Sequence, residues 1–164
     1  MLNSRLIAAA IVLATAAPVA ADCVLLGVAP PYRKTGTATV TVSGSKTITG
    51  RYPAVCGAYF VADAPPLGKA GDGMVFQTCI PDLGSFQVNG SGKERKAGPM
   101  PDAGLILNTD QGSFAASGDA ATRVTVGADL FSANVKASLQ PIRRPKPGEK
   151  VQTFTIEAKF ACGK

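Results

Sequence analysis

The sequence predicts an all-β fold, a small antiparallel β-sandwich or barrel held by two disulfides. Three observations lead to this prediction. Apolar and polar residues alternate along much of the chain, which is typical of strands with one buried side. The 164 residues include 18 glycines and 12 prolines, and many of them fall between the alternating segments, where turns are expected. Four cysteines stand far apart in a chain that also carries an export signal.

Residues 1–21 have the pattern of a secretory signal peptide. Arg5 gives a positive start, residues 6–17 are apolar, and Val19 and Ala21 are the small residues expected before a cut at Asp22. The apolar run is too short for a spanning helix, which needs about 20 residues. An uncut signal anchor is the alternative. We therefore expect a signal peptide at 1–21, a single all-β domain at 22–164, and a periplasmic or secreted location.

The clearest strand pattern lies at residues 151–162. Phe154, Ile156, Ala158, Phe160 and Cys162 fall on one face, and polar residues fall on the other. Turn-rich segments at 43–45, 89–92, 110–112, 117–119 and 141–148 separate further candidates. The other predicted strands are 37–42, 46–51, 54–61, 74–80, 85–89, 104–108, 123–126 and 131–139. Such short strands at turn spacing predict a sandwich or a small barrel, and the absence of tryptophan disfavours an immunoglobulin-type sandwich.

Export to an oxidising compartment makes disulfides the expected state of the four cysteines. Zinc binding is disfavoured because there is no close C-x-x-C pair and no histidine. We predict Cys56–Cys79 and Cys23–Cys162, with the other two connectivities open. Loop closure alone would stabilise the fold by about 3.4 and about 5 kcal/mol for these two bonds. Cys23 is not expected to carry a lipid, because Asp22 stands where a lipoprotein signal has a small residue.

The absence of histidine removes the usual general base of serine and cysteine nucleophiles. A pair of carboxylates is the remaining catalytic arrangement, but most of the aspartates lie in predicted turns, where they cap their own backbone. We therefore expect a non-catalytic protein without cofactor or metal, and a histidine-free carboxylate hydrolase is the less favoured alternative.

Two basic segments are the candidate binding residues. The first contains Lys93, Arg95 and Lys96, and the second contains Arg143, Arg144, Lys146 and Lys150. Pro145 and Pro147 favour an extended backbone in the second segment. Removal of Arg5 with the signal lowers the net charge from +6 to +5. If both segments lie at one end of the domain, they form a single cationic surface.

The predicted function is that of an exported binding or structural module of the bacterial envelope or the secreted fraction. Its expected partner is an anionic envelope component or an acidic protein, with membrane-surface association possible and no span in the mature chain. Solvated charges that bind nothing are the plainer interpretation. Nucleic acid is disfavoured because no aromatic residue interleaves with the basic runs. The alternative is a secreted inhibitor or toxin-type protein that presents the long loop 62–73 to a protein partner.

Overall fold

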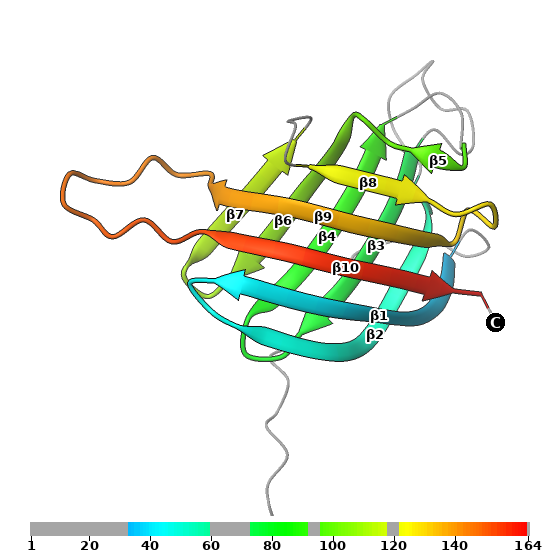
Figure 1. Ribbon diagram of the computed structural model, residues 1–164, viewed down its shortest axis with the longest axis horizontal. Helices are drawn as coiled ribbons and strands as arrows, with labels where there is room; N and C mark the ends of the chain where they lie inside the picture. Colours follow the sequence, from blue (N-terminus) through cyan, green and yellow to red (C-terminus); the bar gives the residue numbers. More distant parts are fainter. Residues whose placement is uncertain (1–32, 60–72, 92–95, 118–121, 164) are drawn as a thin grey trace, which may run out of the picture.

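The computed structural model of the chain describes residues 33–59, 73–91, 96–117 and 122–163 (Figure 1). The described residues form ten strands and no helix. The strands are β1 (Arg33–Gly44), β2 (Ile48–Tyr59), β3 (Gly73–Ile80), β4 (Gly84–Ser91), β5 (Gly98–Pro99), β6 (Ala103–Thr109), β7 (Gly112–Ser117), β8 (Arg123–Val126), β9 (Ser132–Pro141) and β10 (Phe154–Cys162). The predicted all-β class is confirmed.

Eight of the strands close into an antiparallel barrel. The sheet runs in the order β10-β1-β2-β3-β4-β6-β7-β9, and β9 also pairs with β10. The first and last strands therefore lie side by side, as Figure 1 shows. β8 pairs with the first half of β9, and the two-residue β5 pairs with β8. Of the two predicted architectures, the barrel is the one observed.

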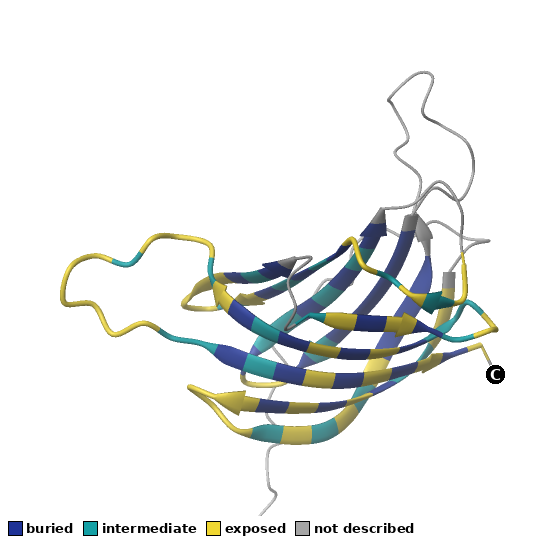
Figure 2. Ribbon diagram, turned by 45° about the horizontal axis from the view of Figure 1, so that its top comes forward, coloured by how far each residue is buried: buried dark blue, intermediate teal, exposed yellow. Residues whose placement is uncertain are grey.

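The barrel interior is filled by apolar side chains. Buried and exposed residues alternate along β10, and the five predicted inward residues, Phe154 to Cys162, are all buried (Figure 2). The Phe160 ring lies 5.6 Å from the Phe76 ring and 6.4 Å from the Phe86 ring, between centroids. Such ring pairs add to the free energy gained from burying the rings themselves.

The predicted disulfide pairing is wrong. Cys56 on β2 bonds to Cys162 on β10, with 6.0 Å between the two Cα atoms. Both side chains belong to the interior core, whereas Cys79 lies one residue before the buried Ile80 and faces out of the barrel. Cys56 and Cys79 thus point to opposite sides of the wall. Cys79 is itself disulfide-bonded, and Cys23 lies outside the described residues.

The Cys56–Cys162 bond spans β1, which runs between β2 and β10. Gly36 of β1 pairs with Cys162 on one side and with Ala54 on the other. A Cβ atom at position 36 would lie 2.1 Å from the Ala161 carbonyl oxygen and 2.5 Å from the Cys162 Cα. Glycine is therefore required at position 36 for β1 and β10 to approach this closely beside Cys162.

The strand predictions differ from the structure at β2, β5 and β7. Within the described residues, the predicted strands 46–51 and 54–61 form one continuous strand, β2, that passes through Pro53. The Pro53 carbonyl accepts a 2.8 Å hydrogen bond from the Thr78 hydroxyl, so this residue still joins β2 to β3 although it has no N–H. No strand was predicted at the two-residue β5. β7 was not predicted, because Gly112 and the short, alanine-rich run after it lack the β-branched residues that signal a strand.

The barrel has two distinct ends. One end carries the β1–β2, β3–β4 and β6–β7 turns and the long β9–β10 connection, and we call it the loop end. The opposite end carries the start of β1, the end of β10 and the connections around β5 and β8. Figure 1 shows the β9–β10 connection extending far beyond the wall.

Candidate functional site

The β9–β10 loop, residues 142–153, carries the second predicted basic segment. Both of its roots are hydrogen-bonded to neighbouring hairpins. At the first root, the Ile142 N–H donates to the Ser113 carbonyl at 2.9 Å, directly after β9 pairs with β7. A polar backbone group at the base of the loop is thereby satisfied, and the loop leaves the wall in a defined direction.

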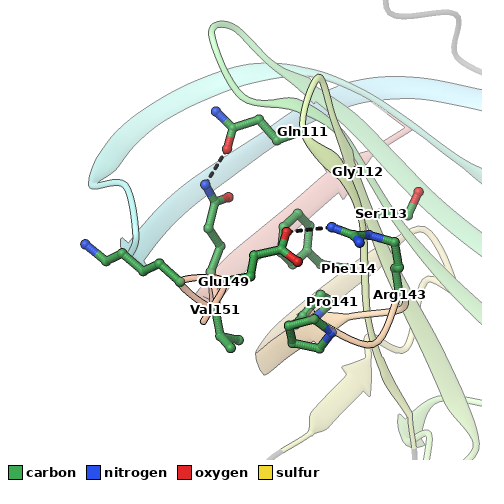
Figure 3. A pocket seen from close by; sticks show the side chains of 11 residues that line it. Gln111, Gly112, Ser113, Phe114, Pro141, Arg143, Glu149 and Val151 are labelled. Atoms are coloured by element: carbon green, nitrogen blue, oxygen red, sulfur yellow. Dashed lines mark hydrogen bonds and ion pairs between the residues drawn. The ribbon is translucent and has the colours of Figure 1, made fainter. Parts of the chain in front are cut away.

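The second root is held by the β6–β7 turn and the β1–β2 turn. The Gln152 side-chain amide donates to the Gln111 side-chain oxygen (Figure 3). Thr153 and Ser45 exchange two hydrogen bonds, from the Ser45 N–H to the Thr153 carbonyl at 3.0 Å and from the Thr153 N–H to the Ser45 hydroxyl at 3.1 Å. Two separate hairpins, β6–β7 and β1–β2, therefore support the loop.

Glu149 holds the middle of the loop together. Its carboxylate accepts from the Arg143 guanidinium at 2.5 Å and from the Lys146 N–H at 2.8 Å, and its own N–H donates to the Lys146 carbonyl at 3.0 Å. The Lys146 N–H and the nearby Arg143 charge hold the pKa of the Glu149 carboxyl below its ordinary value. The ion pair crosses the loop from one side to the other, as the dashed line in Figure 3 shows.

A cleft of about 270 Å³ lies between this loop and the start of β7. Phe114, Pro141 and Val151 supply apolar lining, and the Arg143–Glu149 pair and Gln111 supply polar lining (Figure 3). The Phe114 ring packs edge-on against Phe154, with 4.8 Å between centroids, so the floor of the cleft belongs to the core.

The outer surface of the loop combines cations with apolar side chains. Among the described residues, Arg144, Lys146 and Lys150 are exposed and none of their side chains forms an ion pair. The exposed large hydrophobic residues of the described chain are Ile142 and Val151, at 61% and 48% exposure, and both flank these cations. The loop therefore presents three available positive charges rather than the four that its sequence contains, because Arg143 is paired.

Lys96, the one described member of the first predicted basic segment, does not share a surface with the second segment. Gly84, at the start of β4, pairs with Thr109 beside the β6–β7 turn, so β4 begins at the loop end. Lys96 follows the far end of β4 and lies exposed at the opposite end of the barrel. It already has an interaction partner. Lys93 and Arg95 lie outside the described residues.

The described carboxylates do not provide a buried acid or base. All six are exposed, and the two whose pKa departs from the ordinary value, Asp129 and Glu149, are both lowered. Asp82 and Asp110 do line a common hollow of about 150 Å³ at the loop end, but both remain exposed there. In the part of the chain that the structure describes, no three acidic or cysteine side chains are grouped so that they could hold a metal ion.

The remaining alternative site, the loop 62–73, falls outside the described residues up to residue 72. Its proposed anchor, a Cys56–Cys79 bond, is excluded by the Cys56–Cys162 bond. The sequence interpretation also missed the Glu149 clamp, which unites residues 143, 146 and 149. The acidic residue inside an otherwise basic run was the available signal for it.

Comparisons with protein families, curated proteins and solved structures find no match to this chain. No helix among the described residues is long and apolar enough to cross a membrane.

Proposed function

We propose that this chain is an exported, non-catalytic binding module that engages an anionic partner through the β9–β10 loop. The observation that carries the proposal is the placement of Arg144, Lys146 and Lys150 on a loop fixed at both roots and clamped by Glu149. A loop ordered in advance loses less conformational entropy on binding than a mobile one. Export is supported by the leader-like residues 1–21 and by the disulfide.

The partner class follows from charge. Exposed cations without ion-pair partners attract anionic lipid headgroups, acidic glycans or acidic proteins. Each such cation contributes about 1 kcal/mol near an anionic surface at low salt, so three contribute about 3 kcal/mol, or roughly a hundredfold in affinity. The first predicted basic segment is not needed in this proposal, because its one described member lies at the opposite end.

The test compares two variants with the same net charge. The loop variant is Arg144→Gln, Lys146→Gln, Lys150→Gln. The control is Arg51→Gln, Arg123→Gln, Lys159→Gln, which removes three exposed cations from the barrel wall. Binding is measured at low salt on phosphatidylglycerol vesicles and on immobilised heparin. We expect the loop variant to lose most of its binding and the control to keep it. Equal retention of wild type and both variants, or equal loss in both variants, would refute the proposal.

A further inference from the structure

Part of the outer face of β2 and β3 is buried, although it lies on the side of the wall away from the core. Val55 and Val75 are only 3% and 4% exposed, and Gln77 is 2% exposed. Their neighbours in sequence, Ala54, Cys56, Phe76 and Thr78, are buried on the inner side, so strand alternation directs these three side chains outward. In agreement with this, Val55 and Val75 are not members of the interior core cluster.

None of the described strands lies over this face. The strands in extensive contact with β2 and β3 are β1, β4 and β10, and all of them belong to the same barrel wall. The outward residues are nevertheless shielded from water, and the Gln77 side-chain oxygen has no hydrogen-bond partner. An element other than the described strands must therefore cover them.

Cys79 identifies this element. It lies two residues after Gln77 on the same outward side of β3, and it is disulfide-bonded. Cys56 and Cys162 bond to each other, and none of the three described cysteines is free. The chain contains four cysteines, so within one molecule Cys23 is the only partner left. We infer that the segment 22–32 forms a strap across the outer face of β2 and β3, tied to Cys79 through Cys23.

The length and composition of the segment suit this role. From Arg33 to Cys79 the path crosses two strands and advances about four residues, a span of roughly 17 Å. The ten residue steps from Cys23 to Arg33 reach up to about 33 Å. Residues 23–32 read Cys-Val-Leu-Leu-Gly-Val-Ala-Pro-Pro-Tyr and contain no charge. Such a segment gains free energy by covering Val55 and Val75, which also leave water.

The direct test is peptide mapping of the non-reduced full-length secreted chain. Trypsin places each cysteine on its own peptide, because Lys or Arg residues separate 22–33, 52–69, 70–93 and 160–164. We expect peptide 22–33 linked to 70–93 and peptide 52–69 linked to 160–164. Linkage of Cys79 to a second molecule, seen as a dimer on a non-reducing gel, would overturn the inference, as would any other partner for Cys23.

A second test asks whether the strap is what buries the face. Val75→Lys places a charge under the strap, and Thr41→Lys places one on the exposed outer side of β1. In the otherwise native chain, Val75→Lys should raise the unfolding equilibrium constant roughly tenfold or more, and Thr41→Lys should change it by no more than about twofold. Both are repeated with Cys23→Ser and Cys79→Ser, which release the tether. The cost of Val75→Lys should then fall severalfold, whereas an unchanged cost would show that another segment covers the face.

Discussion

β1 and β3 are both strands of one barrel wall, yet their outer sides differ. The outer side of β1 carries the exposed Thr39 and Thr41, while that of β3 carries the buried Val75 and Gln77. The inner sides of both strands are equally buried. Alternation therefore identifies the side of a strand that faces the core, but not whether the other side is exposed to water. We call the outer side of β1 the exposed wall and the outer side of β2 and β3 around Val75 the covered wall. Four predictions test the contrast between them.

The largest effect on stability is expected for the Cys56–Cys162 disulfide, which joins β2 to β10. Replacing Cys56 and Cys162 together by serine removes a bond between residues 106 apart in sequence. The loop-entropy model gives a loss of at most about 4.7 kcal/mol in the free energy of unfolding. Urea unfolding measures it. Thr39→Ala on the exposed wall is the control, with an expected change within about 0.5 kcal/mol. A similar small loss for the double serine variant would contradict the assigned structural role.

A polar-to-apolar substitution should stabilise the fold on the covered wall but not on an exposed outer side. Gln77→Leu removes a buried oxygen that lacks a hydrogen-bond partner, so we expect stabilisation by about 1 kcal/mol. The same change at the exposed Gln140 of β9 should leave the urea midpoint unchanged or lower it. If both substitutions behave alike, the two positions do not differ in burial in solution.

A smaller effect is expected in the β8–β9 turn, beside the exposed wall. The Asp129 carboxylate accepts from the Ser132 hydroxyl at 2.7 Å and from the Phe131 and Ser132 N–H groups at 3.0 Å. These bonds, the hydroxyl foremost, lower the pKa of Asp129 below its ordinary value. Asp129→Ala should cost about 0.5–1 kcal/mol at pH 7.

The pH dependence of that cost has a definite sign. The folded-state pKa of Asp129 is depressed, so its contribution is complete above the unfolded-state value near 3.8 and declines as the pH falls through the folded value. The difference between wild type and Asp129→Ala should therefore shrink in urea titrations below pH 4. A difference that is constant from pH 7 to pH 2 would show that the carboxylate charge is not responsible.

The smallest effect on stability is expected in the β9–β10 loop. Glu149→Gln breaks the Arg143 ion pair, but the loop lies outside the wall, so the urea midpoint should not change measurably. The loop itself should change: the Lys146 amide resonance, followed by NMR, should titrate in wild type as the pH falls below the ordinary value of 4.5 and should not titrate in the variant. Glu157→Gln, which breaks the exposed Lys136 pair on the wall, is the control. A Lys146 titration that persists in Glu149→Gln would exclude the clamp.

The sequence predicted local features better than long-range ones. The alternation from Phe154 to Cys162 predicted the buried face of β10 correctly, because each residue's side depends only on its position in the strand. The choice between sandwich and barrel depends on whether β10 pairs with β1, and no local pattern encodes that pairing. The disulfide prediction failed because it considered the places of the cysteines along the chain and not the side of the wall that each cysteine faces.

The position of the candidate site in the sequence was predicted, but the contacts within it were not, because they depend on the fold. Residues 143–150 do form a projecting loop, as the prolines and charges indicated. That Glu149 neutralises Arg143 depends on the folding of the loop back on itself, which sequence spacing alone does not give. The separation of Lys96 from this loop depends on the direction of β4 in the barrel.

The seam between β1 and β10 has a consequence for how the protein folds. Gly44 pairs with Phe154 and Gly36 with Cys162, so the two strands that complete the barrel stand at opposite extremes of the domain. Contacts between such distant positions form slowly, because closing so long a loop costs conformational entropy before the contacts stabilise it. Without β10, the remaining strands can form only an open sheet whose edges β1 and β9 are unpaired, and such edges are prone to pair with other chains. Pairing of β10 with both β1 and β9, and not the formation of any single hairpin, is therefore the step that leaves no edge of the eight-stranded barrel unpaired.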